Sequence, residues 1–191
     1  MGEIKKAWEI ALEKAQNIKE LPKDQIDKYN IEKCLMIGSN LAIRYLEQAD
    51  PRQLEHELKK YFGKEKEVVK QAMAKKLIQA IETGNQKRLT AIKKALFLIF
   101  EEQTAFNETI EKIKDLFEQY DQINQKKKEE LAIEGRKRLT ALKISGEAII
   151  EINPAAKDEW KQDLTFLKQL YEEKLNPLKL ELEVQIREQK C

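Results

Sequence analysis

Apolar residues recur at intervals of three and four along most of this chain, and this spacing restricts its fold more than any other feature. The first such series contains Ile4, Trp8, Ala11, Ala15 and Ile18. No stretch alternates between apolar and polar residues as a half-buried strand does, and the 191 residues include only 6 glycines and 4 prolines. Because this period places apolar side chains on one face of a helix, the sequence predicts an all-α protein. We expect a multi-helix bundle with some long antiparallel, coiled-coil-like helix pairs.

Three proline-containing dipeptides mark predicted helix boundaries. Leu-Pro at 21–22 ends the first amphipathic segment, and Asn-Pro at 153–154 begins a later helix, with the asparagine as its cap. Asp-Pro at 50–51 begins another helix, and Gln53 completes its capping box. The apolar face of that short helix is predicted to consist of Leu54, Leu58 and Phe62.

Three further stretches can each be interpreted in more than one way. Gly-Ser at 38–39 interrupts an apolar segment, and we favour close helix packing or a small kink over a binding turn. Residues 124–130 are either an exposed turn of helix or a link, and Pro177 should bend or restart the last helix because it cannot donate a backbone hydrogen bond. None of these stretches divides the chain into domains, so residues 1–191 are expected to form a single helical domain.

The chain has a net charge of +2, but its charges are grouped along the sequence. Residues 52–98 contain twelve Lys or Arg and five Asp or Glu, whereas residues 99–125 contain two and seven. Segments of opposite charge attract each other once they pack, so internal complementarity is the simpler explanation. The alternative is that the basic stretches 59–94 and 126–143 bind nucleic acid or another polyanion.

Residues that commonly carry catalysis are few and isolated in this sequence. His56 is the only histidine, and Gln53 stands where the Glu-x-x-His motif of a di-iron bundle needs glutamate. Cys34 precedes three hydrophobic residues, which favours burial over a nucleophilic role. No phosphate-binding loop of the P-loop type is found. The sequence therefore predicts a protein that is not an enzyme, with no cofactor and no metal site.

One heptapeptide occurs twice, as KRLTAIK at 87–93 and as KRLTALK at 137–143. On a helix, the two aliphatic residues of each copy share an apolar seam, which Leu139 and Leu142 form in the second copy. Basic residues flank this seam, where their aliphatic stems can pack and their charges can reach a neighbouring helix. We expect them to face the acidic block 99–125, which makes the repeat a device for helix packing.

The glycines that precede the two copies keep a functional interpretation open. If Gly84 and Gly135 each end a helix, the first turn of the next helix carries two basic residues. Free backbone N–H groups and cations would then converge on a bound anion. The predicted twin anion-binding site consists of Lys87, Arg88, Lys137 and Arg138. The simpler alternative is that one or both helices continue through the glycine.

The cysteine content and the N-terminal residues predict a cytoplasmic protein. Only Cys34 and Cys191 are present, which fits a reducing compartment better than a disulfide-rich secreted protein. The N-terminal residues lack the apolar core of a signal peptide. The longest apolar run, residues 95–100, is far too short to span a bilayer, so no transmembrane segment is expected.

The stretch EIKKAWEIALEKAQ, at residues 3–16, resembles the start of a family of small, all-helical, uncharacterised bacterial proteins. The similarity covers only these residues and includes no catalytic motif. It implies a bacterial cytoplasmic protein of unknown role, and no functional residue follows from it.

These observations favour a non-enzymatic helical scaffold or protein-interaction protein. The seam-like faces at 4–18 and 160–171 are candidates for contact with a protein partner or for self-association, although both could pack within the monomer. The alternative function is salt-sensitive binding of nucleic acid or another polyanion through residues 59–94 and 126–143.

Overall fold

The computed structural model describes residues 23–100, 103–144, 152–153 and 157–189. Within these ranges the chain forms six helices and no strand, which confirms the predicted all-α helical bundle. The predicted amphipathic helix at 4–18 lies outside the described residues. The helices are α2 (Lys23–Gln48), α3 (Pro51–Leu58), α4 (Gly63–Gln79), α5 (Gln86–Ile99), α6 (Gln103–Ala141) and α7 (Asp158–Glu188).

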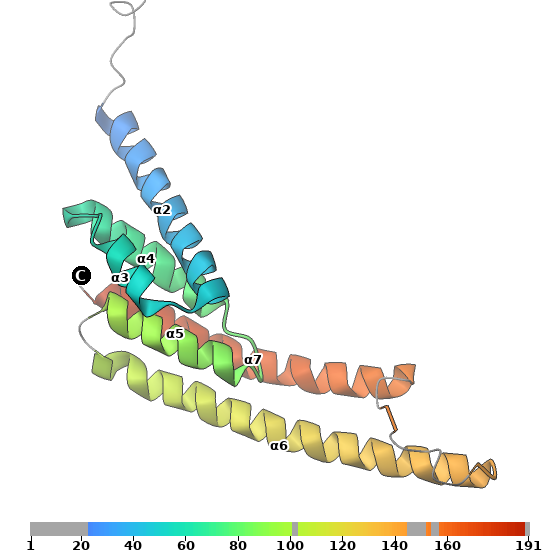
Figure 1. Ribbon diagram of the computed structural model, residues 1–191. Helices are drawn as coiled ribbons and strands as arrows, with labels where there is room; N and C mark the ends of the chain where they lie inside the picture. The colour runs from blue at the N-terminus through green and yellow to red at the C-terminus, as the bar shows by residue number, and fades with distance from the viewer. Residues whose placement is uncertain (1–22, 101–102, 145–151, 154–156, 190–191) are drawn as a thin grey trace, which may run out of the picture.

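The two longest helices, α6 and α7, form an antiparallel pair, and the other helices gather around one end of it (Figure 1). α2 packs mainly along α4, while α4 also contacts α7 and α5 contacts α6. The other end of the pair extends beyond this cluster (Figure 1). We call this extension, residues 124–141 of α6 and 158–170 of α7, the arm.

The hydrophobic core lies where the cluster of helices packs against α6 and α7. Buried side chains recur at intervals of three and four on each helix, so that each helix turns an apolar face inward. Removal of this surface from water, worth about 25 cal/mol per Å², is the main favourable contribution to folding. The fully buried side chains include Met73, Leu77, Ile78, Ile92, Leu96, Phe106, Ile113, Phe117 and Leu182.

Helices α2 and α4 approach each other closely at Gly38. α2 continues through this glycine, and a Cβ atom added there would lie 2.4 Å from the backbone oxygen of Val69 and 2.8 Å from Cβ of Ala72. Only a residue without a side chain fits at that distance from a neighbouring backbone. Close helix packing is therefore the reason for the glycine at this position.

Replacement of Gly38 by alanine is expected to lower the free energy of unfolding by about 2 kcal/mol or more, because the added methyl group overlaps a backbone carbonyl. The better helix propensity of alanine, about 1 kcal/mol, offsets only part of this loss. Urea denaturation followed by circular dichroism measures the change. Ser39→Ala is the matched control at the next, more exposed position. An unchanged denaturation midpoint for Gly38→Ala would contradict the close approach.

The start of α3 is capped as the sequence predicts. Asp50 has extended backbone angles, and its Oδ1 accepts hydrogen bonds from the backbone N–H groups of Arg52 at 2.9 Å and Gln53 at 3.4 Å. Pro51 occupies the first helical position, where its missing N–H costs nothing. Local sequence alone therefore determines where this helix begins.

The end of α3 differs from the prediction. Leu54 and Leu58 are buried, but Phe62 is 78% exposed, so the expectation that all three share one apolar face is wrong. The helix ends at Leu58, and α4 begins at Gly63, whose φ of +53° lies in the left-handed region that glycine adopts without strain. Phe62 lies in this turn, outside the helical register that would have carried it inward.

Helices α6 and α7 are more continuous than predicted. α6 runs through residues 124–130, which are an exposed turn of helix and not a link. α7 runs through Pro177, so the predicted restart of the last helix is wrong. Pro177 cannot donate to the carbonyl of Glu173, one turn earlier, but both residues are exposed, so water can satisfy that oxygen.

The start of α7 also comes later than predicted. Asn153 is not helical, and α7 begins at Asp158, after Lys157 in an extended conformation. The predicted start at residues 153–154 is therefore about one turn too early. Asp158 and Glu159 occupy the first turn, where negative charge interacts favourably with the helix dipole.

A small polar network fixes how α6 and α7 align. Thr109 is fully buried, and its hydroxyl donates to Glu181 Oε1 at 2.9 Å and accepts from Gln185 Nε2 at 3.1 Å. Further along the pair, the rings of Tyr120 and Tyr171 meet edge to face with centroids 5.4 Å apart. A slip of one turn would leave these polar groups without partners in the interior, so the network specifies the register.

Candidate functional site

The first copy of the heptapeptide lies at the start of α5 and helps to build the core. Leu89 and Ile92 are buried, as the predicted seam requires. Lys93 Nζ lies 2.8 Å from Glu111 Oε1 on α6. This cation therefore faces the acidic block 99–125, as the packing interpretation predicts.

The second copy lies at the end of α6, at the tip of the arm. Leu139 is half-buried, but Leu142 is 69% exposed and lies beyond the helix, so the predicted seam is wrong for this copy. The N–H groups of Lys143 and Ile144 bond to the carbonyls of Thr140 and Leu139, each at 3.0 Å. With a φ of +60° at Lys143, this is a helix-terminating motif that glycine usually occupies.

Gly84 and Gly135 precede the two copies for different structural reasons. Gly84 lies in the turn between α4 and α5 with a φ of +79°, and a Cβ atom there would lie 2.9 Å from Tyr120 Cε1. Gly135 lies within α6, where an added Cβ would lie 2.9 Å from the indole ring of Trp160. α6 continues through Gly135, so of the two alternatives left open, the continuous helix holds for the second copy.

The four basic residues of the predicted twin site do not converge. Lys87 and Arg88 lie in the first turn of α5, whereas Lys137 and Arg138 lie near the end of α6, at the far tip of the arm (Figure 1). Cations there are stabilised by the negative end of the helix dipole, which disfavours an anion. Arg138 also pairs with Glu134 on the same helix. The premise of a twin site, that both copies begin a helix, is wrong for the second.

The ion pair between α5 and α6 should make stability depend on pH. The hydrogen bond from Lys93 holds the pKa of the Glu111 carboxyl below its ordinary value of 4.5. A carboxyl whose pKa is lowered by folding stabilises the native state above its unfolded-state pKa. That contribution disappears as the pH falls through the folded-state pKa.

Glu111→Gln is accordingly expected to lower the melting temperature at neutral pH, and its difference from the wild type should shrink as the pH falls through the lowered pKa of the Glu111 carboxyl. Thermal unfolding followed by circular dichroism across this range measures it. Glu118→Gln, an equal charge change on the same helix that leaves the pair with Lys93 intact, serves as the control. A wild-type-to-variant difference that stays constant across the range would count against the ion pair.

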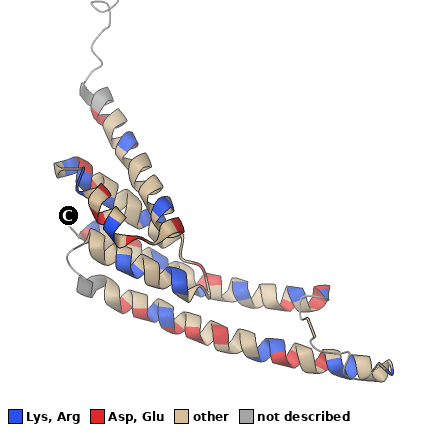
Figure 2. Cartoon of the chain, viewed as in Figure 1, with Lys and Arg blue, Asp and Glu red and all other residues tan. Residues whose placement is uncertain are grey.

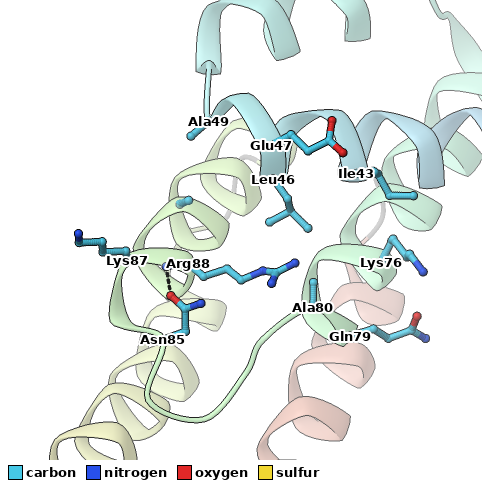
Figure 3. Close-up of a pocket in the computed structure, with 11 residues that line it drawn as sticks. Ile43, Leu46, Glu47, Ala49, Lys76, Gln79, Ala80, Asn85, Lys87 and Arg88 are labelled. Carbon is cyan, nitrogen blue, oxygen red and sulfur yellow. Dashed lines mark hydrogen bonds between the residues drawn. The ribbon is translucent and has the colours of Figure 1, made fainter. Parts of the chain in front are cut away.

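An open pocket of about 630 Å³ lies among the C-terminal ends of α2 and α4 and the start of α5 (Figure 3). Its volume is within the range of pockets that hold small molecules. Three basic side chains line it beside one acidic and several apolar ones. The lining includes Lys76, Lys87, Arg88, Glu47, Asn85, Gln79, Ile43, Leu46 and Ala80.

Two contacts hold Arg88 at this pocket. Its backbone N–H donates to the capping Asn85 Oδ1 at 3.0 Å, and its guanidinium lies 3.0 Å from Glu82 Oε1. Figure 3 shows the Arg88 side chain reaching across the pocket, while Lys87 points away from it. A cation beside the N–H groups of a helix start is an arrangement that favours an anionic group.

Helix α7 carries a second apolar stripe, which the sequence analysis did not identify. Phe166, Leu170, Leu180 and Val184 are 69%, 40%, 62% and 50% exposed, and Pro177 is exposed between them. Together with Glu173, they follow one another at intervals of four, three, four, three and four. This 3.5-residue repeat places all six positions along one line of the helix. We call them the outer stripe.

The opposite face of α7 is already occupied. The predicted seam at 160–171 packs against α6, with Trp160 and Tyr171 buried and the two leucines between them half-buried. Of the two alternatives for this seam, packing within the monomer is therefore the one observed. A search for a second 3.5-residue series on the same helix would have found the outer stripe from the sequence.

One ion pair joins α6 and α7 within the arm. Lys127 Nζ on α6 lies 3.0 Å from Asp163 Oδ2 on α7, and both side chains are partly exposed. Ile123, which is 45% exposed, lies one turn before Lys127, and Phe166 lies one turn after Asp163. Ile123 and Phe166 therefore each lie about one turn from this ion pair, on α6 and α7 respectively.

Charge is distributed more evenly than the sequence blocks suggest. Figure 2 shows Lys and Arg interspersed with Asp and Glu along both α6 and α7. Several pairs join residues one turn apart on a single helix, where each contributes little to stability. Such pairs include Lys112–Glu108, Lys114–Glu118 and Lys168–Glu172.

His56 and Cys34 are the two residues whose catalytic potential the sequence analysis considered. His56 is exposed, and Cys34 is buried, which raises the pKa of its thiol. Among the residues that the structure describes, no three His, Cys, Asp or Glu side chains are grouped as metal ligands. The two surfaces that remain as candidates are the outer stripe and the pocket at Arg88.

A scan against protein-family models, a search of curated proteins and a search of solved structures each find no match to this chain. The resemblance of residues 3–16 to uncharacterised bacterial proteins therefore stays a prediction. In the described ranges, every helix is too short or too polar to cross a membrane.

Proposed function

We propose that this chain is a non-enzymatic, cytosolic interaction protein that binds a partner helix through the outer stripe of α7. The observation that carries the proposal is the alignment of Phe166, Leu170, Leu180 and Val184, all exposed, on one face of a continuous helix. Single exposed apolar residues are common on protein surfaces, whereas a contiguous apolar patch marks an interaction site.

The period of the outer stripe indicates what kind of partner it fits. A 3.5-residue repeat keeps an apolar line facing a second helix over several turns, as in a coiled coil. From Phe166 to Val184 the stripe is roughly 27 Å long, at 1.5 Å per residue. α7 is fixed from behind by its contacts with α6 and α4, so it offers a rigid surface that loses little conformational freedom on binding.

Two features support a non-catalytic role, and one of them also supports a reducing compartment. The buried thiol of Cys34 has a raised pKa, which disfavours the reactive thiolate. The lone histidine, His56, is exposed on the short helix α3 and does not line the pocket at Arg88. A buried reduced cysteine is typical of the cytosol.

The outer stripe can be tested with a fluorescent three-heptad peptide whose apolar stripe alternates leucine and alanine. We expect the wild-type chain to raise the anisotropy of this peptide, and Phe166→Ser/Leu180→Ser to weaken its binding by about tenfold or more, because central apolar anchors dominate helix docking. The control Phe62→Ser removes an equally exposed phenylalanine that lies off the stripe.

Urea denaturation of the same variants separates binding from folding. Since all three residues are exposed, each variant should keep its free energy of unfolding within about 0.5 kcal/mol of the wild type. Equal peptide binding by the wild type and the double variant would refute the proposed function.

A second candidate function is binding of an anion, such as a nucleic-acid phosphate, in the pocket at Arg88. The specific observation in its favour is that Arg88 and Lys76 line one pocket at the start of α5 and that the Arg88 side chain reaches across it, with Lys87 at its edge. This narrows the predicted basic surface to part of the stretch 59–94. The other stretch, 126–143, lies on the arm and includes carboxylates such as Glu134, which pairs with Arg138.

The two heptapeptide copies provide matched variants for this second candidate. Lys87→Gln/Arg88→Gln should reduce retention on phosphocellulose and flatten its dependence on salt, because each cation that binds a phosphate releases a counterion. Lys137→Gln/Arg138→Gln changes net charge equally and should leave retention nearly unchanged. Equal losses for both variants would show that net charge, and not the pocket, governs retention.

A further inference from the structure

We infer that the partner of the outer stripe is a second copy of this chain, paired through antiparallel α7 helices. This inference rests on the proposed function, since it names the partner of the same surface. The intervals between the six positions of the outer stripe are 4, 3, 4, 3 and 4 residues in either direction along the helix. The stripe can therefore lie against a reversed copy of itself with every position matched. Such self-complementarity is what a twofold-symmetric interface requires.

The sizes of the side chains match in the antiparallel arrangement. Phe166 then faces Val184 of the second copy, and Leu170 faces Leu180. Phenylalanine, the largest of the four side chains, thus meets valine, the smallest, and the two leucines meet each other. The gap between the two helices therefore stays nearly constant along the seam. In a parallel arrangement Phe166 would face Phe166 and Val184 would face Val184, and the helices would have to diverge to pack at constant density.

Charge also favours the antiparallel arrangement. Glu173 is the one ionisable residue in the outer stripe. Side by side in parallel helices, the two copies of Glu173 would meet in the seam, where like charges repel and lose solvent. In the antiparallel arrangement each Glu173 faces Pro177 of the other copy, and the two carboxylates lie on opposite sides of the twofold axis.

Each outer stripe belongs to an α6–α7 pair in which α6 packs against the opposite face of α7. Two α6–α7 pairs joined in this way make a four-helix arrangement of antiparallel neighbours. The seam is short compared with interfaces of standard size, so we expect a dimer that dissociates at micromolar concentration.

Sedimentation of the full chain over a concentration series tests the association. We expect the average mass to approach twice that of the monomer at high concentration, and Phe166→Ser/Leu180→Ser to remain monomeric, with Phe62→Ser behaving as the wild type. A monomer at every concentration would overturn the inference. If that monomer still bound the heptad peptide through the outer stripe, the proposed function would stand without it.

Cross-linking with a short bismaleimide tests the direction of the helices. In a Cys191→Ser background that keeps the buried Cys34, we expect a mixture of Leu170→Cys and Leu180→Cys to cross-link, and each variant alone to cross-link at least fivefold less. Residues 170 of the two copies would lie roughly 15 Å apart along the antiparallel seam. Efficient cross-linking of each variant with itself would indicate parallel helices and overturn the arrangement.

Residues 1–22 are the other part of this chain that could cover the outer stripe. Deletion of residues 1–22 should leave the maleimide reactivity of Leu180→Cys in the monomeric, dilute protein unchanged. An increase in reactivity would show that this segment covers the stripe, and would overturn the second copy as its partner.

Discussion

The alignment of α6 with α7 determines which face of α7 is covered and which is left exposed. The buried hydroxyl of Thr109 bonds to Glu181 and Gln185, and the contact of Tyr120 with Tyr171 lies further along the same pair. These contacts hold one face of α7 against α6 and leave the opposite face open. A shift of one or two residues would rotate α7 and turn part of the outer stripe inward, because adjacent residues on a helix point about 100° apart.

The repeated heptapeptide shows how little a short sequence says about its surroundings. Both threonines of the repeat, Thr90 and Thr140, bond to the carbonyl four residues earlier, so the first five residues of each copy are helical. The first copy nevertheless lies in the core and the second at an exposed helix end. Thus nearly the same heptapeptide forms a packing face in one place and a helix terminus in another.

Two glycines that look alike in the sequence also have unlike roles. Gly84 supplies a left-handed turn, which the sequence anticipates from its place between two amphipathic segments. Gly135 makes room for the indole of Trp160, which arrives from a helix that begins more than twenty residues later. A close approach between distant segments leaves no local signal, so no pattern around Gly135 could distinguish it from a helix end.

The sequence by itself determined the helical class, the cap at Asp50 and the burial of Cys34, because these depend on spacing and on neighbours within a few residues. Only the tertiary structure decided that α6 and α7 continue through residues 124–130 and Pro177, since contacts along the partner helix outweigh local interruptions. It also decided which of the two apolar faces of α7 is covered. Both faces have the same period, and only the packing of α6 and α4 against one of them leaves the other exposed.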